Sequence, residues 1–241
     1  MEAVKTERLI KKYGDVTALG GADLSVAEGE LFGLLGVNGA GKTTLIRILS
    51  GLIKPTEGEA YVFGKSVRSE MPAIKEIADV SPQETSVAPN LTVRENLEFF
   101  ASIYFADKTV RKARVDEITA TFKLGEVLGN RAKTLSGGWQ RRLSIAVALI
   151  SKPKILFLDE PTLGLDVLAR RDLWRVIEQL KGKVTILLTS HYLEEIEALC
   201  DRVAIMTKGK IVMVGTVDEI KYAAGEKNFE DAFVKIVEVK K

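Results

Sequence analysis

Short apolar segments alternate with amphipathic stretches along most of the chain. The segments at 31–36, 154–160 and 184–191 are nearly continuous apolar runs, and the last two end in polar residues. Such runs are typical of strands buried on both faces of a sheet. An amphipathic helical pattern at 43–52 follows the first of them after a glycine-rich turn. This alternation predicts an α/β fold with a mostly parallel sheet covered by helices.

The middle of the chain interrupts this series of strands with helices. Helical patterns cover 92–105 and about 108–123, and Thr92 and Glu95 have the spacing of a capping box at the start of the first. Beyond the last predicted parallel strand, 202–215 has the pattern of a hairpin. We therefore expect a helical insertion within one α/β core.

Composition narrows the classes of function. The chain has 241 residues, of which 46% are hydrophobic, and 35 Lys and Arg against 33 Asp and Glu give a net charge of +2. A balance this close to zero argues against a general nucleic-acid binder. Cys200 and His191 are the only residues of their types. An internal disulfide and a metal site built from several His and Cys are therefore excluded, and a reducing compartment is expected.

No segment predicts membrane insertion. Residues 1–14 carry charges throughout, unlike a secretory signal, and the longest apolar run, 145–150, is far shorter than the ~18 residues of a membrane helix. We expect a chain that is soluble by itself and reaches a membrane only through a partner.

The segment 36–44 (GVNGAGKTT) satisfies a phosphate-loop pattern between a predicted strand and a predicted helix. Its small residues leave backbone N–H groups free to bind phosphate oxygens, and the start of the helix adds positive potential. Lys42 is expected to reach the terminal phosphates of a nucleoside triphosphate, and the Thr43 hydroxyl to hold Mg²⁺. The competing interpretation is an ordinary glycine turn that caps a helix.

A pair of carboxylates follows the apolar strand at 154–160. In an open α/β sheet, ligands bind at the carboxyl ends of the strands, where Asp159 and Glu160 are expected. Asp159 is then placed to hold Mg²⁺, and Glu160 to accept a proton from attacking water. Alternatively, Asp-Glu before Pro161 simply ends a strand at the surface.

The segment 135–150 (LSGGWQRRLSIAVALI) separates the classes of phosphate-loop protein. With Leu135, Ser136, Gly137 and Gly138 it resembles the signature of the ATP-binding subunits of ATP-binding cassette (ABC) transporters, and the resemblance covers nearly the whole chain. Ser136 is expected to cap a helix whose exposed N–H groups face an anion. The alternative is a plain serine cap on a core helix.

The resemblance implies further site residues. Tyr13 matches the aromatic residue that stacks on adenine, and Gln83 the glutamine that senses Mg²⁺ and attacking water. Asp166 matches the acidic residue of a loop that crosses the dimer, and His191 the histidine that contacts the γ-phosphate. Taken singly, these are a surface aromatic, a loop amide, a helix cap and a structural histidine.

The complete expected site follows from motif and resemblance together. The catalytic residues are Glu160, His191, Lys42 and Gln83, and the ligands of Mg²⁺ are Thr43, Gln83 and Asp159. The residues that contact ATP are Tyr13, Gly36, Asn38, Gly39, Ala40, Gly41, Lys42, Thr43, Thr44, Ser136, Gly137, Gly138 and Asp166. Trp139 departs from the family, which commonly has Gln at that position.

The resemblance also implies an organisation and partners. It implies a P-loop NTPase core of the ABC ATPase type with an N-terminal antiparallel β part, at 1–83 and 136–230, an inserted helical subdomain at 84–135, and a helical appendage at 228–241. Two chains, identical or related, close head to tail over two ATP and two Mg²⁺ and drive an integral membrane permease, with no nucleic acid bound. The expected location is cytoplasmic, on the inner face of the membrane.

The branch of the family is indicated by 190–216 and 228–237, which are similar to bacterial subunits that export drugs, lipids, polysaccharides or sodium. Rival interpretations are a non-transport ABC ATPase that acts on ribosomes or DNA, a monomeric phosphate-loop kinase or GTPase, and a scaffold that binds ATP without turnover. Leu91, Val93, Phe99, Phe100, Tyr104 and Phe105 are expected mainly in the core. The alternative is that some of them line a groove that receives a short helix of the membrane subunit. The surface of 84–105 is expected to carry the ATP signal to the permease.

Overall fold

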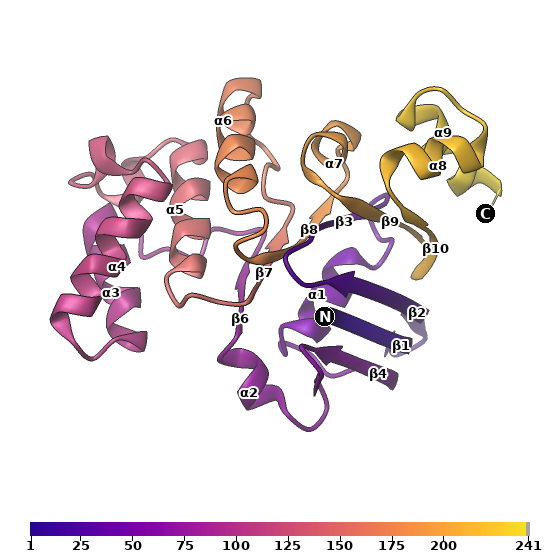
Figure 1. Cartoon of the computed structure of the whole chain (residues 1–241), viewed down its shortest axis with the longest axis horizontal. Helices are drawn as coiled ribbons and strands as arrows, with labels where there is room; N and C mark the ends of the chain where they lie inside the picture. Colours follow the sequence, from indigo (N-terminus) through magenta and orange to yellow (C-terminus); the bar gives the residue numbers. More distant parts are fainter. Residues whose placement is uncertain (240–241) are drawn as a thin grey trace.

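A six-stranded sheet forms the middle layer of the computed structural model, which describes residues 1–239 (Figure 1). Its strands lie in the order β10 (Lys210–Gly215), β9 (Arg202–Thr207), β3 (Leu31–Leu35), β8 (Thr185–Ser190), β7 (Ile155–Asp159) and β6 (Ala78–Ser81). All neighbouring pairs are parallel except β10 with β9. The carboxyl ends of the parallel strands therefore meet at one edge of the sheet.

Both faces of this sheet are covered, each by different elements, and this explains why its strands are apolar at nearly every position. On β3, Leu31 and Leu35 join one hydrophobic cluster, while Phe32 and Leu34 join another on the opposite face. The second cluster includes α1 (Lys42–Leu49) and α2 (Met71–Lys75) and an antiparallel sheet in the order β2 (Val16–Ala27), β1 (Glu2–Tyr13), β4 (Glu57–Val62) and β5 (Lys65–Ser66). Both faces are thus dry, as sequence patterning predicts.

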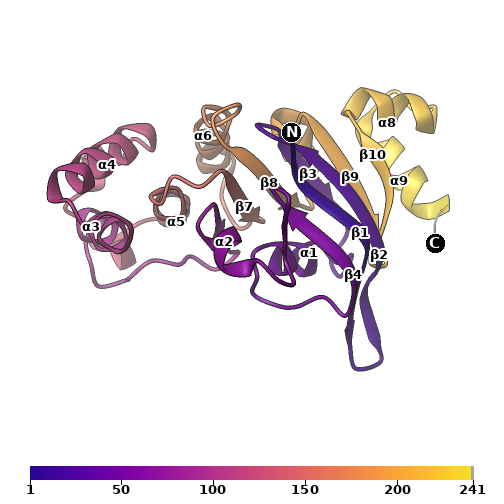
Figure 2. The same cartoon turned by 60° about the horizontal axis from the view of Figure 1, so that its bottom comes forward.

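Helices cover the other face and extend to both ends of the molecule (Figures 1 and 2). Over the sheet lie α5 (Gly137–Leu149), α6 (Val167–Glu178) and α7 (Leu193–Leu199). At one end are α3 (Val93–Tyr104), α4 (Lys108–Thr121) and the 3₁₀ turns Gly125–Val127 and Ala132–Thr134. At the other end are α8 (Val217–Ala224) and α9 (Phe229–Val239).

The predicted elements are present, with ends that differ by a few residues. The hairpin forms, and the capping box at the start of α3 is confirmed, since Thr92 and Glu95 exchange side-chain and backbone hydrogen bonds. The expectation that the aromatic residues of this region lie in the core is wrong for Phe99 and Tyr104, which are 53% and 48% exposed. Phe99 lies on the outer face of α3, while Val93 and Leu97 fill the buried face. Tyr104, the last residue of α3, is half-exposed, and its hydroxyl forms a hydrogen bond with Asp79 of β6.

Two further expectations concern boundaries and the membrane. The helical subdomain at 84–135 stays a prediction, because α5 packs against α3 and α4 and also against β6 and β7. The last two residues of the expected appendage at 228–241 lie outside the described residues. Within residues 1–239, no helix has the length and apolar character needed to cross a membrane.

Candidate functional site

The phosphate loop lies between the buried strand β3 and α1. Gly41, at the start of α1, has φ +102°, and a Cβ there would lie 2.6 Å from the Ala18 oxygen, so both conformation and space require glycine. Lys42 is 5% exposed, and its Nζ donates to the Gly36 oxygen at 2.6 Å. The loop is therefore folded around its own lysine, with the start of α1 behind it.

A pocket of about 430 Å³ opens on this loop. Ten of the predicted site residues line it: Asn38, Gly39, Ala40, Gly41, Lys42, Thr43, Thr44, Gln83, Glu160 and His191. Tyr13 is not among its lining residues. It ends β1, is 46% exposed, and lies opposite Val16, which does line the pocket. Residues from five separate segments thus converge. Four of them follow the carboxyl ends of β3, β6, β7 and β8, which share one edge of the sheet, and the fifth, 16–18, begins β2.

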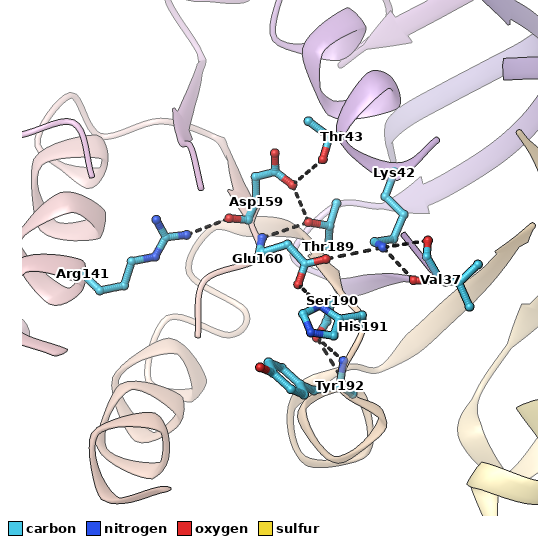
Figure 3. Close-up of polar contacts among 11 residues, drawn as sticks. Val37, Lys42, Thr43, Arg141, Asp159, Glu160, Thr189, Ser190, His191 and Tyr192 are labelled. Carbon is cyan, nitrogen blue, oxygen red and sulfur yellow. Dashed lines mark hydrogen bonds and ion pairs between the residues drawn. The ribbon is translucent and has the colours of Figure 1, made fainter. Parts of the chain in front are cut away.

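Asp159 ends β7 and holds two hydroxyl groups. Its Oδ1 accepts from Thr43 Oγ1 at 3.1 Å and from Thr189 Oγ1 at 2.6 Å, and the side chain is almost fully buried (Figure 3). Thr189 lies on the neighbouring strand β8 and also accepts from the Glu160 backbone N–H at 2.9 Å. The strand end is therefore fixed to both α1 and β8.

Glu160 lies between a cation and an imidazole. Its Oε1 is 3.4 Å from Lys42 Nζ, and its Oε2 is 2.7 Å from His191 Nδ1 (Figure 3). The Glu160 side chain is only 9% exposed, and its backbone φ is +49°. Few side chains adopt this conformation, which costs about 1–3 kcal/mol and persists only where neighbouring contacts hold it. The pair of carboxylates is thus part of a built site and not a strand end at the surface.

Gln83 follows β6 and borders two adjoining pockets. One is the phosphate-loop pocket, and the second, of about 440 Å³, is lined by Gln83 together with Thr43 and Asp159. The three predicted ligands of Mg²⁺ therefore border one space. All three supply oxygen atoms, which Mg²⁺ prefers.

The signature segment lies in a different place. Ser136 occupies the cap position of α5 as predicted, but its side chain makes no capping hydrogen bond and is exposed. A Cβ on Gly138 would lie 2.9 Å from the Ala169 Cβ, so glycine permits α5 and α6 to approach closely. Ser136, Gly138 and Trp139 line a pocket of about 300 Å³ that shares no residue with the phosphate-loop pocket.

Asp166 has a structural contact in this chain. Its Oδ1 accepts from the backbone N–H groups of Leu168 and Ala169, both at 2.9 Å, so it caps α6. This is the helix-cap interpretation, and any contact across a dimer stays a prediction.

Trp139 stacks with Arg142, whose guanidinium lies 4.5 Å from the centre of the Trp139 ring.

Three buried polar residues next to the site carry no motif that predicts their role: Thr189, Arg141 and Glu195. Thr189 joins Asp159 to Glu160, and Arg141 donates to backbone oxygens beside both Gln83 and Glu160. Glu195 on α7 accepts from Trp174 Nε1 at 3.1 Å, and burial raises the pKa of its carboxyl. Arg141 could have been found from the sequence, because it is a charged residue on the same helical face as Ser144 and Ala148, which are buried.

Comparisons with known proteins agree with this geometry. The family model described as "ABC transporter" matches residues 19–163, and a shorter match at 131–197 is to "AAA domain, putative AbiEii toxin, Type IV TA system". The daunorubicin resistance ATP-binding protein DrrA3 of Streptomyces coeruleorubidus is 40% identical over 92% of this chain and 71% of its own length.

Two further matches extend the comparison. The probable multidrug ABC transporter ATP-binding protein YbhF of Escherichia coli is 34% identical over 97% of this chain, which spans only 41% of YbhF. A solved dimer of the ATP-binding cassette MJ0796, in a post-hydrolysis state with ADP and Pi, is 26% identical and covers 88% of this chain and 98% of its own, with a TM-score of 0.79.

Proposed function

The chain belongs to the ABC transporter family as an ATP-binding subunit that hydrolyses ATP, and on this premise we propose that it works as one half of a head-to-tail dimer that powers a membrane permease. The observation that carries the proposal is the split of the site within one chain. The phosphate loop and Ser136 line separate pockets with no shared residue. Each ATP is then held between the loop of one chain and Ser136 of a second copy or a related cassette.

The phosphates bind at the start of α1. Backbone N–H groups of the loop face the phosphate oxygens, and Lys42 supplies the charge for the terminal phosphates. Its partners Glu160 and the Gly36 oxygen already fix the direction of its ammonium group. Tyr13, exposed at the end of β1, is the proposed platform for adenine. The partner chain adds the free hydroxyl of Ser136 and the first N–H groups of its α5.

The residues present fit Mg²⁺. Thr43 and Asp159 already place a hydroxyl and a carboxylate within hydrogen-bond distance, and Gln83 borders the same space. Within residues 1–239, no group of three or more His, Cys, Asp and Glu side chains could form a metal site by itself. An ion here would take its remaining ligands from phosphate and water, as Mg²⁺ does with nucleotides. When bound, Mg²⁺ neutralises charge on the β- and γ-phosphates.

Glu160 is the proposed general base. It accepts a proton from water while the water oxygen attacks the γ-phosphorus, and the bond to the bridging oxygen of ADP breaks. His191, held 2.7 Å from Glu160 Oε2, orients the carboxylate, and its exposed edge is available to the γ-phosphate. Lys42 and the partner's α5 terminus stabilise the charge that develops. After hydrolysis the two chains of the dimer separate.

The membrane partner is proposed to dock on α3. Phe99, Ile103 and Tyr104 leave 53%, 61% and 48% of their surface exposed on this helix. The segment that begins with Gln83 leads directly from the nucleotide site to α3. Similarity to DrrA3 and YbhF favours export of drugs, from a position on the inner face of the membrane.

Capture from membranes tests the proposal. Glu160→Gln keeps the shape of the base but cannot accept the proton, so the variant should bind ATP, lose turnover by about 10²-fold or more, and remain closed. Tagged Glu160→Gln protein, incubated with ATP and Mg²⁺ in detergent-solubilised native membranes, should co-purify an integral membrane protein in near-equal amount. Capture of ribosomes or nucleic-acid proteins instead would support the non-transport ABC ATPase.

A further inference from the structure

A buried guanidinium connects the signature helix to the hydrolytic residues. Arg141 lies in the second turn of α5 and is 4% exposed. Its Nε donates to the Pro161 oxygen at 2.8 Å. Its Nη2 donates to the Asp159 oxygen at 2.8 Å (Figure 3). Its Nη1 donates to the Gln83 oxygen at 3.2 Å and also to the Pro82 oxygen.

These four acceptors belong to the two segments that carry the reacting groups. Asp159 and Pro161 flank Glu160 on either side, and Pro82 directly precedes Gln83. All four bonds go to backbone oxygens, so Arg141 fixes the path of the chain through Glu160 and Gln83. A planar guanidinium with five donors can serve two segments at once, whereas an ammonium group is a single point.

The charge of Arg141 is compensated at longer range. Burial lowers the pKa of the guanidinium to about 10, while the charges of Asp159, Glu195 and Glu160 oppose that shift. The group therefore remains charged at neutral pH. No carboxylate forms an ion pair with it among residues 1–239. The buried charge is thus stabilised by the backbone carbonyls that Arg141 binds and by the negative charges of Asp159, Glu195 and Glu160.

We propose that Arg141 is a positioning residue, which holds Glu160 and Gln83 of its own chain in register with α5 so that water and the base are aligned. The proposal rests on the function proposed above. Because Ser136 begins the same helix, engagement of Ser136 by the partner's ATP then bears on the geometry of this chain's own site. A displacement of about 1 Å in a reacting group costs up to about 10²-fold in rate.

Arg114 provides a matched control at the opposite end of α5. It is 6% exposed, and its guanidinium donates to the Ile150 oxygen at 3.1 Å and to the Leu149 oxygen. It touches no residue of the proposed site. Arg114 lies on α4, whereas Arg141 lies on α5. Both are buried and donate to backbone carbonyls, but only Arg141 reaches the site.

The test compares Arg141→Lys with Arg114→Lys in the full chain. We expect both to lower the melting temperature and both to bind ATP within about twofold of wild type. Turnover of Arg141→Lys should fall by about tenfold or more at unchanged KM, while Arg114→Lys stays within about twofold. Arg141→Gln, a neutral variant with two donors, repeats the comparison should the lysine variant fail to fold. Equal turnover of the Arg141 and Arg114 variants, or a loss confined to KM, would overturn the proposal.

Mixed dimers with Lys42→Ala show which site Arg141 serves. When Lys42→Ala is mixed with Ser136→Arg, one site of the mixed dimer has the intact phosphate loop of the Ser136→Arg chain and the intact signature of the Lys42→Ala chain. Activity should therefore recover. When Lys42→Ala is mixed with Arg141→Lys, the only intact phosphate loop of the mixed dimer is in the Arg141→Lys chain. The Glu160 and Gln83 segments beside that loop are the altered ones, so activity should stay low. Equal recovery of both mixtures would overturn the proposal. Failure of wild type to hydrolyse ATP, or of Ser136→Arg to recover, would contradict the proposed function instead.

Discussion

The backbone of Glu160 shows how single residues hold the site. Its φ of +49° places a non-glycine residue in the left-handed region at a cost of about 1–3 kcal/mol. The Glu160 N–H donates to Thr189 Oγ1, and Arg141 binds the oxygens of the residues on either side. These contacts offset the strain and leave the carboxylate directed at Lys42 and His191. The strained residue is the proposed base.

His191 is expected to act by orienting this base. In His191→Ala, Lys42 is the one polar partner left to the carboxylate among residues 1–239. Turnover should therefore fall by about tenfold or more, with ATP affinity within about twofold. Steady-state hydrolysis and nucleotide titration measure the two quantities. Tyr192→Phe is the control, because it retains the ring that packs on His191 at 4.1 Å between centroids. Wild-type turnover in His191→Ala would exclude this role.

Glu195 predicts a dependence of stability on pH. Burial raises the pKa of its carboxyl above the usual 4.5, so the folded state favours the neutral form. The contribution to stability is therefore complete below pH 4.5 and is lost as pH rises through the folded pKa. Glu195→Gln keeps the acceptor for Trp174 Nε1 without the charge, and should unfold at higher temperature than wild type at neutral pH.

Melting temperatures measured across a range of pH test whether the neutral form of Glu195 is the stabilising one. The difference between Glu195→Gln and wild type should shrink towards acid pH. Glu197→Gln, on the exposed side of the same helix, should show no such trend. A Glu195→Gln variant less stable than wild type at neutral pH would show that the carboxylate is the favoured form.

At the scale of elements, the sequence predicts most strands but few of the contacts between them. The runs at 31–36, 154–160 and 184–191 are recognisable because both faces of each strand are buried, so nearly every position is apolar. The partners of Arg141 lie 20 and 59 residues away, at Pro161 and Pro82, and no local pattern indicates them. The outer face of α3 is misjudged because aromatic residues at helical spacing usually indicate core.

The close approach of α5 and α6 gives a prediction for two neighbouring glycines. A Cβ at Gly138 would lie 2.9 Å from Ala169 Cβ, whereas one at Gly137 meets only Leu165 Cδ2 at 3.8 Å. Gly138→Ala should therefore be less stable than Gly137→Ala by about 1–3 kcal/mol in urea unfolding, because the extra methyl overpacks the helix pair. Equal stabilities would mean that the helices separate without cost.

The exposed face of α3 predicts loss of coupling. Ile103→Glu places a charge on the proposed docking surface, so substrate transport by the assembled transporter should fall by about tenfold while ATP binding to the isolated chain is unchanged. Val110→Glu, on the adjacent helix α4 at 49% exposure, is the control and should transport normally. Weaker nucleotide binding in Ile103→Glu would contradict a role confined to the partner.

The whole molecule contains two half-sites in different places. The loop pocket gathers residues from the carboxyl ends of β3, β7 and β8, while Ser136 stands at the start of α5 beside α6. The sequence motifs predict each half, because each is a short local pattern. Their separation within one chain depends on the positions of the strands and helices, which no motif contains. This separation is the structural basis for a shared site.

The mass of Glu160→Gln in solution with ATP and Mg²⁺, measured by light scattering, tests the shared site most directly. We expect twice the 26.4 kDa of one chain with ATP and Mg²⁺, and the mass of a single chain when Ser136→Arg is added to the same variant. A chain that stays monomeric at saturating ATP, or a dimer that survives Ser136→Arg, would contradict the shared site.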